Sequence, residues 1–119
     1  MLAVFGVVRR NGRILVCKRP SGGAFPGYWE FPTEALEGEE TAENALERAF
    51  FERLTACPKS VKSLGAVDAF YGEDVRLLGY EVVLRKNFFQ LYGYEDFRWV
   101  KPRNLKHLRM LRPFVTFLT

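Results

Sequence analysis

The side chains best suited to chemistry are concentrated between Glu34 and Arg53. Acidic residues gather over this stretch, and two arginines, Arg48 and Arg53, are interspersed among them. Carboxylate oxygens are the donors that a hard cation such as Mg²⁺ prefers, and carboxylates three or four residues apart on a helix can lie side by side. A guanidinium group binds anions instead. The stretch is therefore a candidate for cation or phosphate chemistry.

A helix is predicted to present these side chains. Residues 43–54 fit a helix with Thr41 as the N-cap and acidic residues over the first turn, where the helix dipole favours them. Successive positions of a helix lie about 100° apart. One apolar arc then comprises Leu46, Phe50 and Leu54, which should pack on a sheet. The adjacent arc comprises Ala45, Ala49, Glu52 and Arg53.

The other expected elements are strands, turns and short helical segments. Apolar runs predict strands at 2–9, 14–18, 28–31, 61–70, 75–84, 88–91 and 97–100. The dipeptide Asn11-Gly12 between two apolar runs is a strong hairpin signal, and the Gly- and Pro-rich residues 19–27 should form a loop. Pro102 opens a short helical segment that ends near Leu108, and residues 111–118 should form a final helix. This order predicts a single α+β domain over residues 1–119.

Composition narrows the functional classes. The formal charge is +4 and the pI is about 9.3, so the chain should attract anions such as nucleotides or nucleic acid. Basic residues crowd the C-terminal quarter, which can serve a polynucleotide partner but more usually forms a solvated helical surface. We expect no membrane span, no signal peptide and a cytoplasmic location. Cys17 and Cys57 lack metal-site spacing and should be reduced thiols. Phe51 projects away from both helical arcs, so we expect it to be exposed. An exposed phenylalanine can contribute to a subunit contact, and a homodimer therefore stays among the alternatives.

The segment Trp29-Glu30-Phe31-Pro32, followed by Glu40, Arg48 and Glu52, resembles the Nudix box. The family pattern is G-x5-E-x7-R-E-U-x-E-E-x-G-U, where U is a bulky apolar residue. Glu40, Arg48, Phe50 and Glu52 match it without a gap. Four positions depart from it, namely Glu34, Ala49, Arg53 and Thr55, which replace two glycines and two glutamates.

The resemblance extends over most of the chain and implies a fold and an activity. Arg19-Pro20 with the following loop, and Arg98-Trp99-Val100 with Pro102, are similar to segments of the MutT-like branch and of the C-terminal domain of MutY-type adenine glycosylases. The implied fold is a mixed β-sheet sandwiched between helices. The implied activity is pyrophosphohydrolysis of nucleoside diphosphate-linked compounds such as nucleoside triphosphates, with Mg²⁺ as the cofactor.

Site residues follow from the same resemblance. The catalytic candidates are Glu40, Glu52 and Arg48, and Glu52 and Glu40 are also the metal-ligand candidates. The phosphate-binding candidates are Arg53 and Arg19. The substrate-pocket candidates are Trp29, Phe31 and Tyr71.

The departures weaken the expected metal site. Ala49 offers no donor, and Arg53 places a fixed positive charge where a divalent cation should bind. The sequence therefore predicts a Nudix-type hydrolase of weak activity. One alternative is a catalytically inactive domain that binds a nucleotide or phosphorylated ligand, with Arg53 standing in for the cation. The other is a MutY-like DNA-recognition module that relies on the basic C-terminal residues.

Overall fold

Two strands near the N-terminus form the centre of the molecule. The computed structural model describes residues 1–86 and 89–118, and it places β1 (Leu2–Val7) and β3 (Arg13–Lys18) in two neighbouring sheets. Their buried side chains alternate between two hydrophobic clusters: Phe5 of β1 belongs to one cluster, whereas Val4 belongs to the other. Side chains of a strand point to opposite faces in turn, so both faces of β1 are covered.

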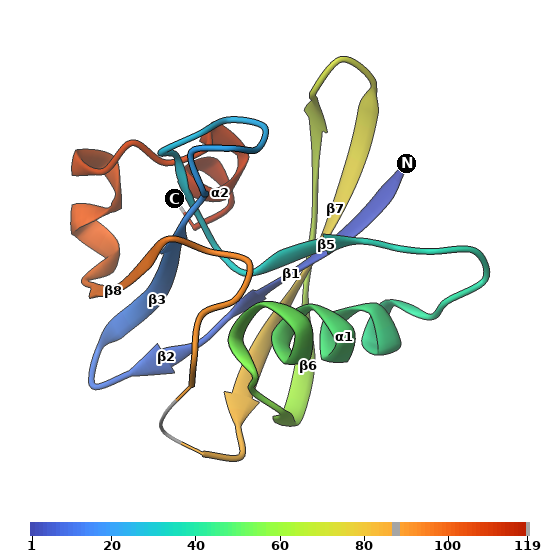
Figure 1. The fold of residues 1–119 in the computed structure, drawn as a ribbon, viewed down its shortest axis with the longest axis horizontal. Coiled ribbons are helices and arrows are strands. Elements are labelled where there is room, and N and C mark those ends of the chain that lie inside the picture. The colour runs from blue at the N-terminus through green and yellow to red at the C-terminus, as the bar shows by residue number, and fades with distance from the viewer. Residues whose placement is uncertain (87–88, 119) are drawn as a thin grey trace.

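The two sheets have different compositions. The first has the order β5 (Thr33–Ala35), β1, β7 (Asp74–Leu84) and β6 (Pro58–Phe70), and it is mixed because β1 and β7 run parallel. In the second sheet, β2 (Arg9–Arg10), β4 (Trp29–Glu30) and β8 (Asp96–Val100) all pair with β3, antiparallel in each case. Figure 1 shows the β6–β7 hairpin projecting beyond the rest of the fold.

Helices cover both faces of this framework. Helix α1 (Ala42–Leu54) packs against the cluster that contains Val4, Leu15 and Val82. The 3-10 helix η1 (Pro102–His107) and helix α2 (Arg112–Leu118) contribute Leu105 and Phe114 to the other cluster. In Figure 1, α1 lies at one side of the strands and the C-terminal segments lie at another. The expected α+β fold, with a mixed sheet between helices, is confirmed. Among the described residues, no helix is both long and apolar enough to cross a lipid bilayer.

Several predicted elements are confirmed. The hairpin turn has Asn11 at φ 50° and Gly12 at φ 75°, as a tight turn between twisted strands requires. Helix α1 begins after Thr41, whose side-chain hydroxyl accepts a hydrogen bond from the Asn44 N–H at 3.1 Å. The long strands β6 and β7 pair antiparallel, and Phe51 is 62% exposed.

The strand predicted at 88–91 is wrong for residues 89–91, which belong to no strand; Phe88 lies outside the described residues. Residues 90–92 instead satisfy carbonyls at the end of α1: the N–H of Gln90 donates to the Leu54 carbonyl, and that of Tyr92 donates to the Arg53 carbonyl. The strand expected over residues 2–9 is divided into β1 and β2, and β2 extends to Arg10. Strand β5 was not expected; its three residues pair with β1.

Candidate functional site

Arg48 gathers the acidic side chains of the loop that precedes α1. Its guanidinium donates two hydrogen bonds to the Glu40 carboxylate, Nε to Oε2 and Nη2 to Oε1, both at 3.0 Å. Nη2 also donates to the Ala35 carbonyl at 2.8 Å. Glu37 and Glu52 lie 3.4 and 3.7 Å from Nη1. Arg48 therefore fastens the loop to the helix, a role that the bidentate geometry of a guanidinium suits.

These bonds set the ionisation of Glu40. The hydrogen bonds from Arg48 lower the pKa of the Glu40 carboxyl, and the N–H of Glu37, which donates to the same carboxylate at 3.1 Å, lowers it further. Glu40 is thus held in its charged form and is already engaged by an arginine. Glu52, by contrast, is 54% exposed, and its Oε2 lies 3.7 Å from Arg48 Nη1.

Arg53 forms a second charged pair, with Glu34 of β5. Its Nε and Nη2 both lie 3.2 Å from Glu34 Oε2. The guanidinium carbon also lies 5.5 Å from the centre of the Tyr94 ring. Burial disfavours the charge on Arg53, but the neighbouring Tyr94 and Glu34 raise its pKa above the ordinary value. The side chain therefore remains a cation.

Gly93 allows the chain to approach this arginine. A Cβ atom at position 93 would lie 2.9 Å from Arg53 Cγ, closer than real side chains come. The segment around Gly93 also carries Tyr94, so one loop supplies both the close backbone approach and the aromatic ring.

A buried carboxylate lies behind the Arg53 pair. Glu30 is 1% exposed, accepts from Arg19 Nη1 at 2.7 Å, and accepts from the Tyr94 hydroxyl at 2.6 Å. That hydroxyl in turn accepts from the Thr33 N–H at 3.1 Å. Burial raises the pKa of the Glu30 carboxyl, although Arg19 and Tyr94 act in the opposite direction. The network links β4, β5 and the loop before β8.

Neither Glu30 nor Tyr94 was predicted as a site residue. Glu30 did carry a signal, because it is an ionisable residue between Trp29 and Phe31 in an apolar strand. A buried charge of that kind requires partners. Tyr94 carried no signal, since its position 64 residues away is joined to Glu30 only by the fold.

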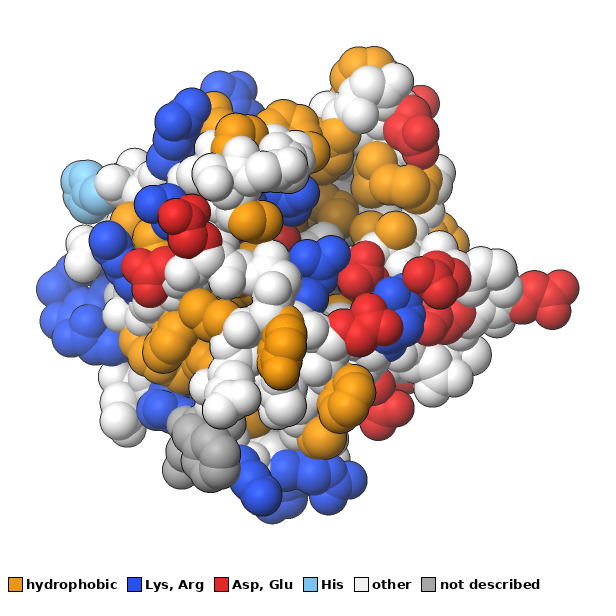
Figure 2. Space-filling model, in the orientation of Figure 1, with side chains coloured by type: hydrophobic (Ala, Val, Ile, Leu, Met, Phe, Trp, Pro, Cys, Tyr) orange, Lys and Arg blue, Asp and Glu red, His pale blue; other side chains and the backbone are white. Residues whose placement is uncertain are grey.

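The charged pairs help to line a cavity of about 240 Å³. Its lining includes Arg19, Glu30, Glu34 and Arg53, together with apolar residues such as Leu77. Figure 2 shows acidic and basic side chains intermixed on the face that carries α1. The cavity therefore combines two arginines with an apolar wall.

A larger cavity adjoins the first. Its volume is about 680 Å³, and it lies between the end of the β6–β7 hairpin and α2. Phe25, Tyr71 and Leu111 line both cavities. In Figure 2 a recess separates the projecting hairpin from the rest of the molecule, and the side chains visible in it are mainly hydrophobic.

The structure brings together three of the residues predicted from the sequence. Arg19, Arg53 and Tyr71 all line the smaller cavity. Glu40, Arg48 and Glu52 lie beside it, around the Arg48 guanidinium, and do not belong to its lining.

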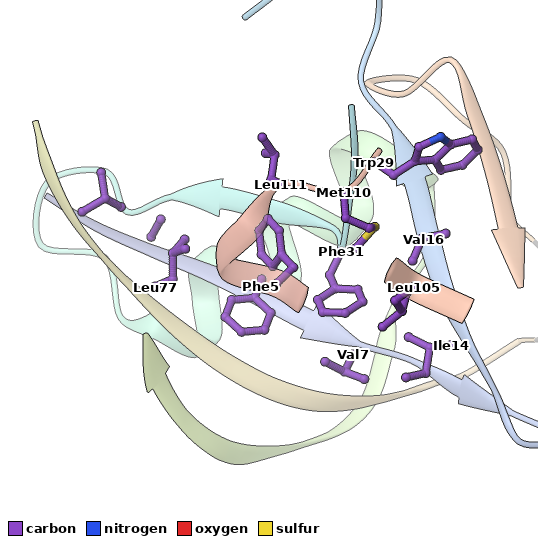
Figure 3. Close-up of a cluster of buried hydrophobic side chains, with 13 residues drawn as sticks. Phe5, Val7, Ile14, Val16, Trp29, Phe31, Leu77, Leu105, Met110 and Leu111 are labelled. Carbon is purple, nitrogen blue, oxygen red and sulfur yellow. The ribbon is translucent and has the colours of Figure 1, made fainter. Parts of the chain in front are cut away.

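Trp29 and Phe31 differ from their prediction as pocket residues. Phe31 is fully buried and Trp29 is 5% exposed, and both belong to the core cluster beneath η1 and α2. Figure 3 shows Phe31 beside Phe5 and Met110, with Trp29 at the edge of the same cluster. The family resemblance assigned both residues to the pocket, but in the structure their side chains pack in the core.

The side chains at the box positions do not fit Mg²⁺ in the manner that the family pattern implies. Ala49 is fully buried and has no donor atom, and Arg53 directs a guanidinium at Glu34. Within the described parts of the chain, no group of three or more His, Cys, Asp or Glu residues is placed to hold a metal ion. The carboxylates that remain surround Arg48, a cation that the chain itself supplies.

Comparisons with known proteins agree over nearly the whole chain. A family model described as NUDIX domain matches residues 3–119. The nucleoside triphosphatase NudI of Escherichia coli O139:H28 is 24% identical over 118 residues, which covers 85% of this chain and 82% of the relative. The same enzyme from Shigella flexneri matches equally well.

Solved structures show the same fold. The MutT NUDIX hydrolase of Burkholderia pseudomallei superposes with a TM-score of 0.87 at 21% identity, over 98% of this chain and 94% of the other. The NUDIX domain of Shewanella oneidensis NrtR, solved with ADP ribose, superposes with a TM-score of 0.81 at 16% identity, over 99% and 83% of the two chains.

Proposed function

This chain belongs to the Nudix family, and from that membership we propose that it binds the diphosphate group of a nucleotide or related compound through Arg53 and Arg19 and hydrolyses it weakly at most. The observation that carries the proposal is the Arg53 guanidinium in the wall of the smaller cavity, at a box position where the family pattern has a glutamate. A ligand there meets a fixed cation of the protein.

Both arginines keep donors for an anion. A guanidinium has five N–H donors, and among the described residues the contacts between Arg53 and Glu34 are made by Nε and Nη2. Arg19 uses Nη1 for Glu30 and Nε for the Ala24 carbonyl at 2.7 Å. The two carboxylates hold the arginines in place, and the remaining donors can be offered to phosphate oxygens.

Weak hydrolysis follows from the state of the acidic residues. Glu40 accepts two hydrogen bonds from Arg48, so a metal ion or a water molecule would have to compete with a bidentate ion pair. Glu52 is more accessible but would have to act without the partner glutamates of the family pattern. Metal-assisted hydrolysis, which Nudix hydrolases generally use, would therefore have little support from these side chains.

The relatives support the class of ligand. One is named a nucleoside triphosphatase, and a structural neighbour was solved with ADP ribose, a compound with a diphosphate bridge. Both descriptions belong to those proteins. For this chain they favour nucleoside triphosphates and nucleoside diphosphate derivatives as the compounds to examine first.

A thermal-shift panel tests the proposal. Nucleoside triphosphates, ADP, ADP-ribose and inorganic pyrophosphate would each be measured with MgCl₂ and again with EDTA, because a ligand that binds the native state raises its melting temperature. We expect stabilisation by at least one of these compounds that persists in EDTA. Stabilisation seen only with Mg²⁺, or rapid release of phosphate or pyrophosphate, would overturn the proposed role of Arg53.

Two variants locate the binding. Arg53→Gln removes the cation from the cavity and should abolish most of the shift. Lys106→Gln removes one positive charge from an exposed position of η1 and should leave the shift unchanged. Equal losses in the two variants would show that the ligand responds only to net charge.

A further inference from the structure

The charged side chains that line the smaller cavity balance one another. Within residues 1–86 and 89–118, they are two arginines and two carboxylates, namely Arg19, Arg53, Glu30 and Glu34. Arg19 Nη1 lies 2.7 Å from Glu30, and Arg53 Nε lies 3.2 Å from Glu34. The amino group of Met1 is exposed and donates to the Asp74 carbonyl instead. A diphosphate carries several negative charges, so its entry leaves an excess of negative charge in the cavity.

The two carboxylates differ in how they tolerate this excess. Glu34 has a second cation within reach, because Arg48 Nη1 lies 3.6 Å from its Oε2, and its side chain is 19% exposed. Glu30 is 1% exposed, and among the described residues its one ion pair is with Arg19. Water cannot replace a partner at a side chain buried to this degree. Glu30 is therefore the carboxylate that a bound anion destabilises most.

The groups around Glu30 make it the natural acceptor of a proton. Charged and titratable side chains of the neighbouring segments lie near Glu30 or line its cavity: Arg19, Arg53, Cys17, Glu34, Tyr71 and Tyr94. Burial raises the pKa values of the cysteine and of both tyrosines, so these three groups are neutral near neutral pH. Burial also raises the pKa of Glu30, although Arg19, Tyr94 and Arg53 lower it. A bound anion raises it further, because it repels the carboxylate.

We infer that a diphosphate enters this cavity together with a proton, which comes from the solvent and is bound by Glu30. The proton neutralises the carboxylate, and no bond of the ligand is broken. Glu30 Oε1, which now accepts from Arg19, can then donate to a phosphate oxygen, and Arg19 Nη1 can turn to the ligand. The inference rests on the proposed function and adds that binding depends on pH.

The direction of the pH effect follows from linkage. When a ligand raises the pKa of a protein group, binding takes up protons and becomes tighter as the pH falls. Uptake of one proton changes the affinity by about tenfold per pH unit above the pKa of Glu30 in the free protein. Pyrophosphate itself also titrates near neutral pH. The effect of Glu30 is therefore measured as a difference between two proteins that bind the same ligand.

Calorimetric titration with inorganic pyrophosphate in EDTA, in buffers of different ionisation enthalpy, counts the protons taken up on binding. We expect the unaltered protein to take up more protons than Glu30→Gln, by up to about one. Glutamine resembles the protonated acid, so Glu30→Gln should bind pyrophosphate more tightly than the unaltered protein at about pH 8, and this advantage should shrink as the pH falls. If Glu30 only held Arg19 in place, the variant would bind more weakly at every pH, which would overturn the inference.

Glu34→Gln is the matched control, because it removes the same charge from the same cavity by the same chemical change. It should keep most of the proton uptake, since Glu34 has Arg48 and Arg53 as partners and stays ionised. An equal loss of proton uptake in the two variants would show that the proton responds to the net charge of the cavity and not to Glu30.

Infrared difference spectra of the unaltered protein give a readout that does not depend on the folding of a variant. Pyrophosphate should produce the C=O stretching band of a protonated carboxyl group. If pyrophosphate does not bind in EDTA, the proposed function fails and the inference fails with it. If pyrophosphate binds without this band, or if Glu30→Gln takes up as many protons as the unaltered protein, the inference alone is refuted.

Discussion

The ion pair between Arg53 and Glu34 gives the most direct test of how the site is built. We expect a double-mutant cycle with Arg53→Met and Glu34→Gln to show strong coupling. Methionine keeps a long apolar side chain against Tyr94 but removes the charge, and glutamine keeps the shape of Glu34. Each single variant should lower the free energy of unfolding, and the double variant should lose less than the sum of the two.

The magnitude follows from the contact. At 3.2 Å and an effective dielectric constant near 20, opposite unit charges attract by about 5 kcal/mol. The side chains are 28% and 19% exposed, so solvent screening and the cost of desolvation offset much of this attraction. We therefore expect a coupling free energy of about 1–3 kcal/mol.

Urea unfolding of the four proteins at neutral pH would supply the values, provided that each unfolds in a single cooperative transition. The exposed pair of Arg9 and Glu81, with a similar distance of 3.1 Å but side chains 46% and 36% exposed, is the matched control. Its coupling should be below about 0.5–1 kcal/mol. Coupling for Arg53 and Glu34 no larger than for this control would refute the view that Glu34 holds Arg53 in place.

The same pair governs the restoration of metal binding. Ala49→Glu with Arg53→Glu should raise the affinity for Mg²⁺, but a carboxylate at position 53 would face Glu34 and repel it. Ala49 is also fully buried, so the new side chain must displace its neighbours. Adding Glu34→Gly removes the repulsion, and the triple variant should bind Mg²⁺ more tightly than the double variant in calorimetric titrations. No gain in either variant would mean that the metal site is wrongly placed.

Three further predictions concern other parts of the chain. Thr55 ends α1 at φ 52°, so Thr55→Gly should raise the unfolding free energy by about 0.5–1 kcal/mol in urea, and a loss would refute the strain. Burial raises the pKa of the Cys17 thiol, whereas Cys57 is exposed, so a thiol reagent should label Cys57 alone until the protein unfolds. The pKa of Glu40 is lowered by Arg48 in the folded state, so its stabilising effect is present above pH 4.5 and is lost as the pH falls through the lower folded-state pKa. Arg48→Met should therefore make the free energy of unfolding depend less on pH below pH 4.5. An unchanged pH dependence in this range would refute Arg48 as the cause.

Much of the fold could be predicted from local patterns. The apolar runs that form β1 and β3, the Asn11-Gly12 turn and the cap at Thr41 each depend on residues close in sequence. The strand expected at 88–91 shows the limit of such patterns. Its apolar residues were consistent with a strand, but the backbone N–H of Gln90 donates a hydrogen bond to the Leu54 carbonyl at the end of α1 instead.

The candidate site was predictable only in part, for a related reason. The sequence showed that Glu34 and Arg53 both depart from the family pattern. From the sequence alone they were interpreted separately, as the loss of a glycine and the loss of a glutamate. Position 34 lies in β5 and position 53 lies near the end of α1, so only the packing of these elements makes the two changes one ion pair.

Residue types and short spacings were enough to identify the family, the helix that carries the box and the charges along that helix. Which of these charges meet depends on how distant segments pack. Packing places Arg48 among four carboxylates and buries Glu30 between Arg19 and Tyr94. It also places Trp29 and Phe31 in the core rather than in the expected pocket. Electrostatic energy depends on distance and burial, and both quantities exist only once segments far apart in the chain have packed together.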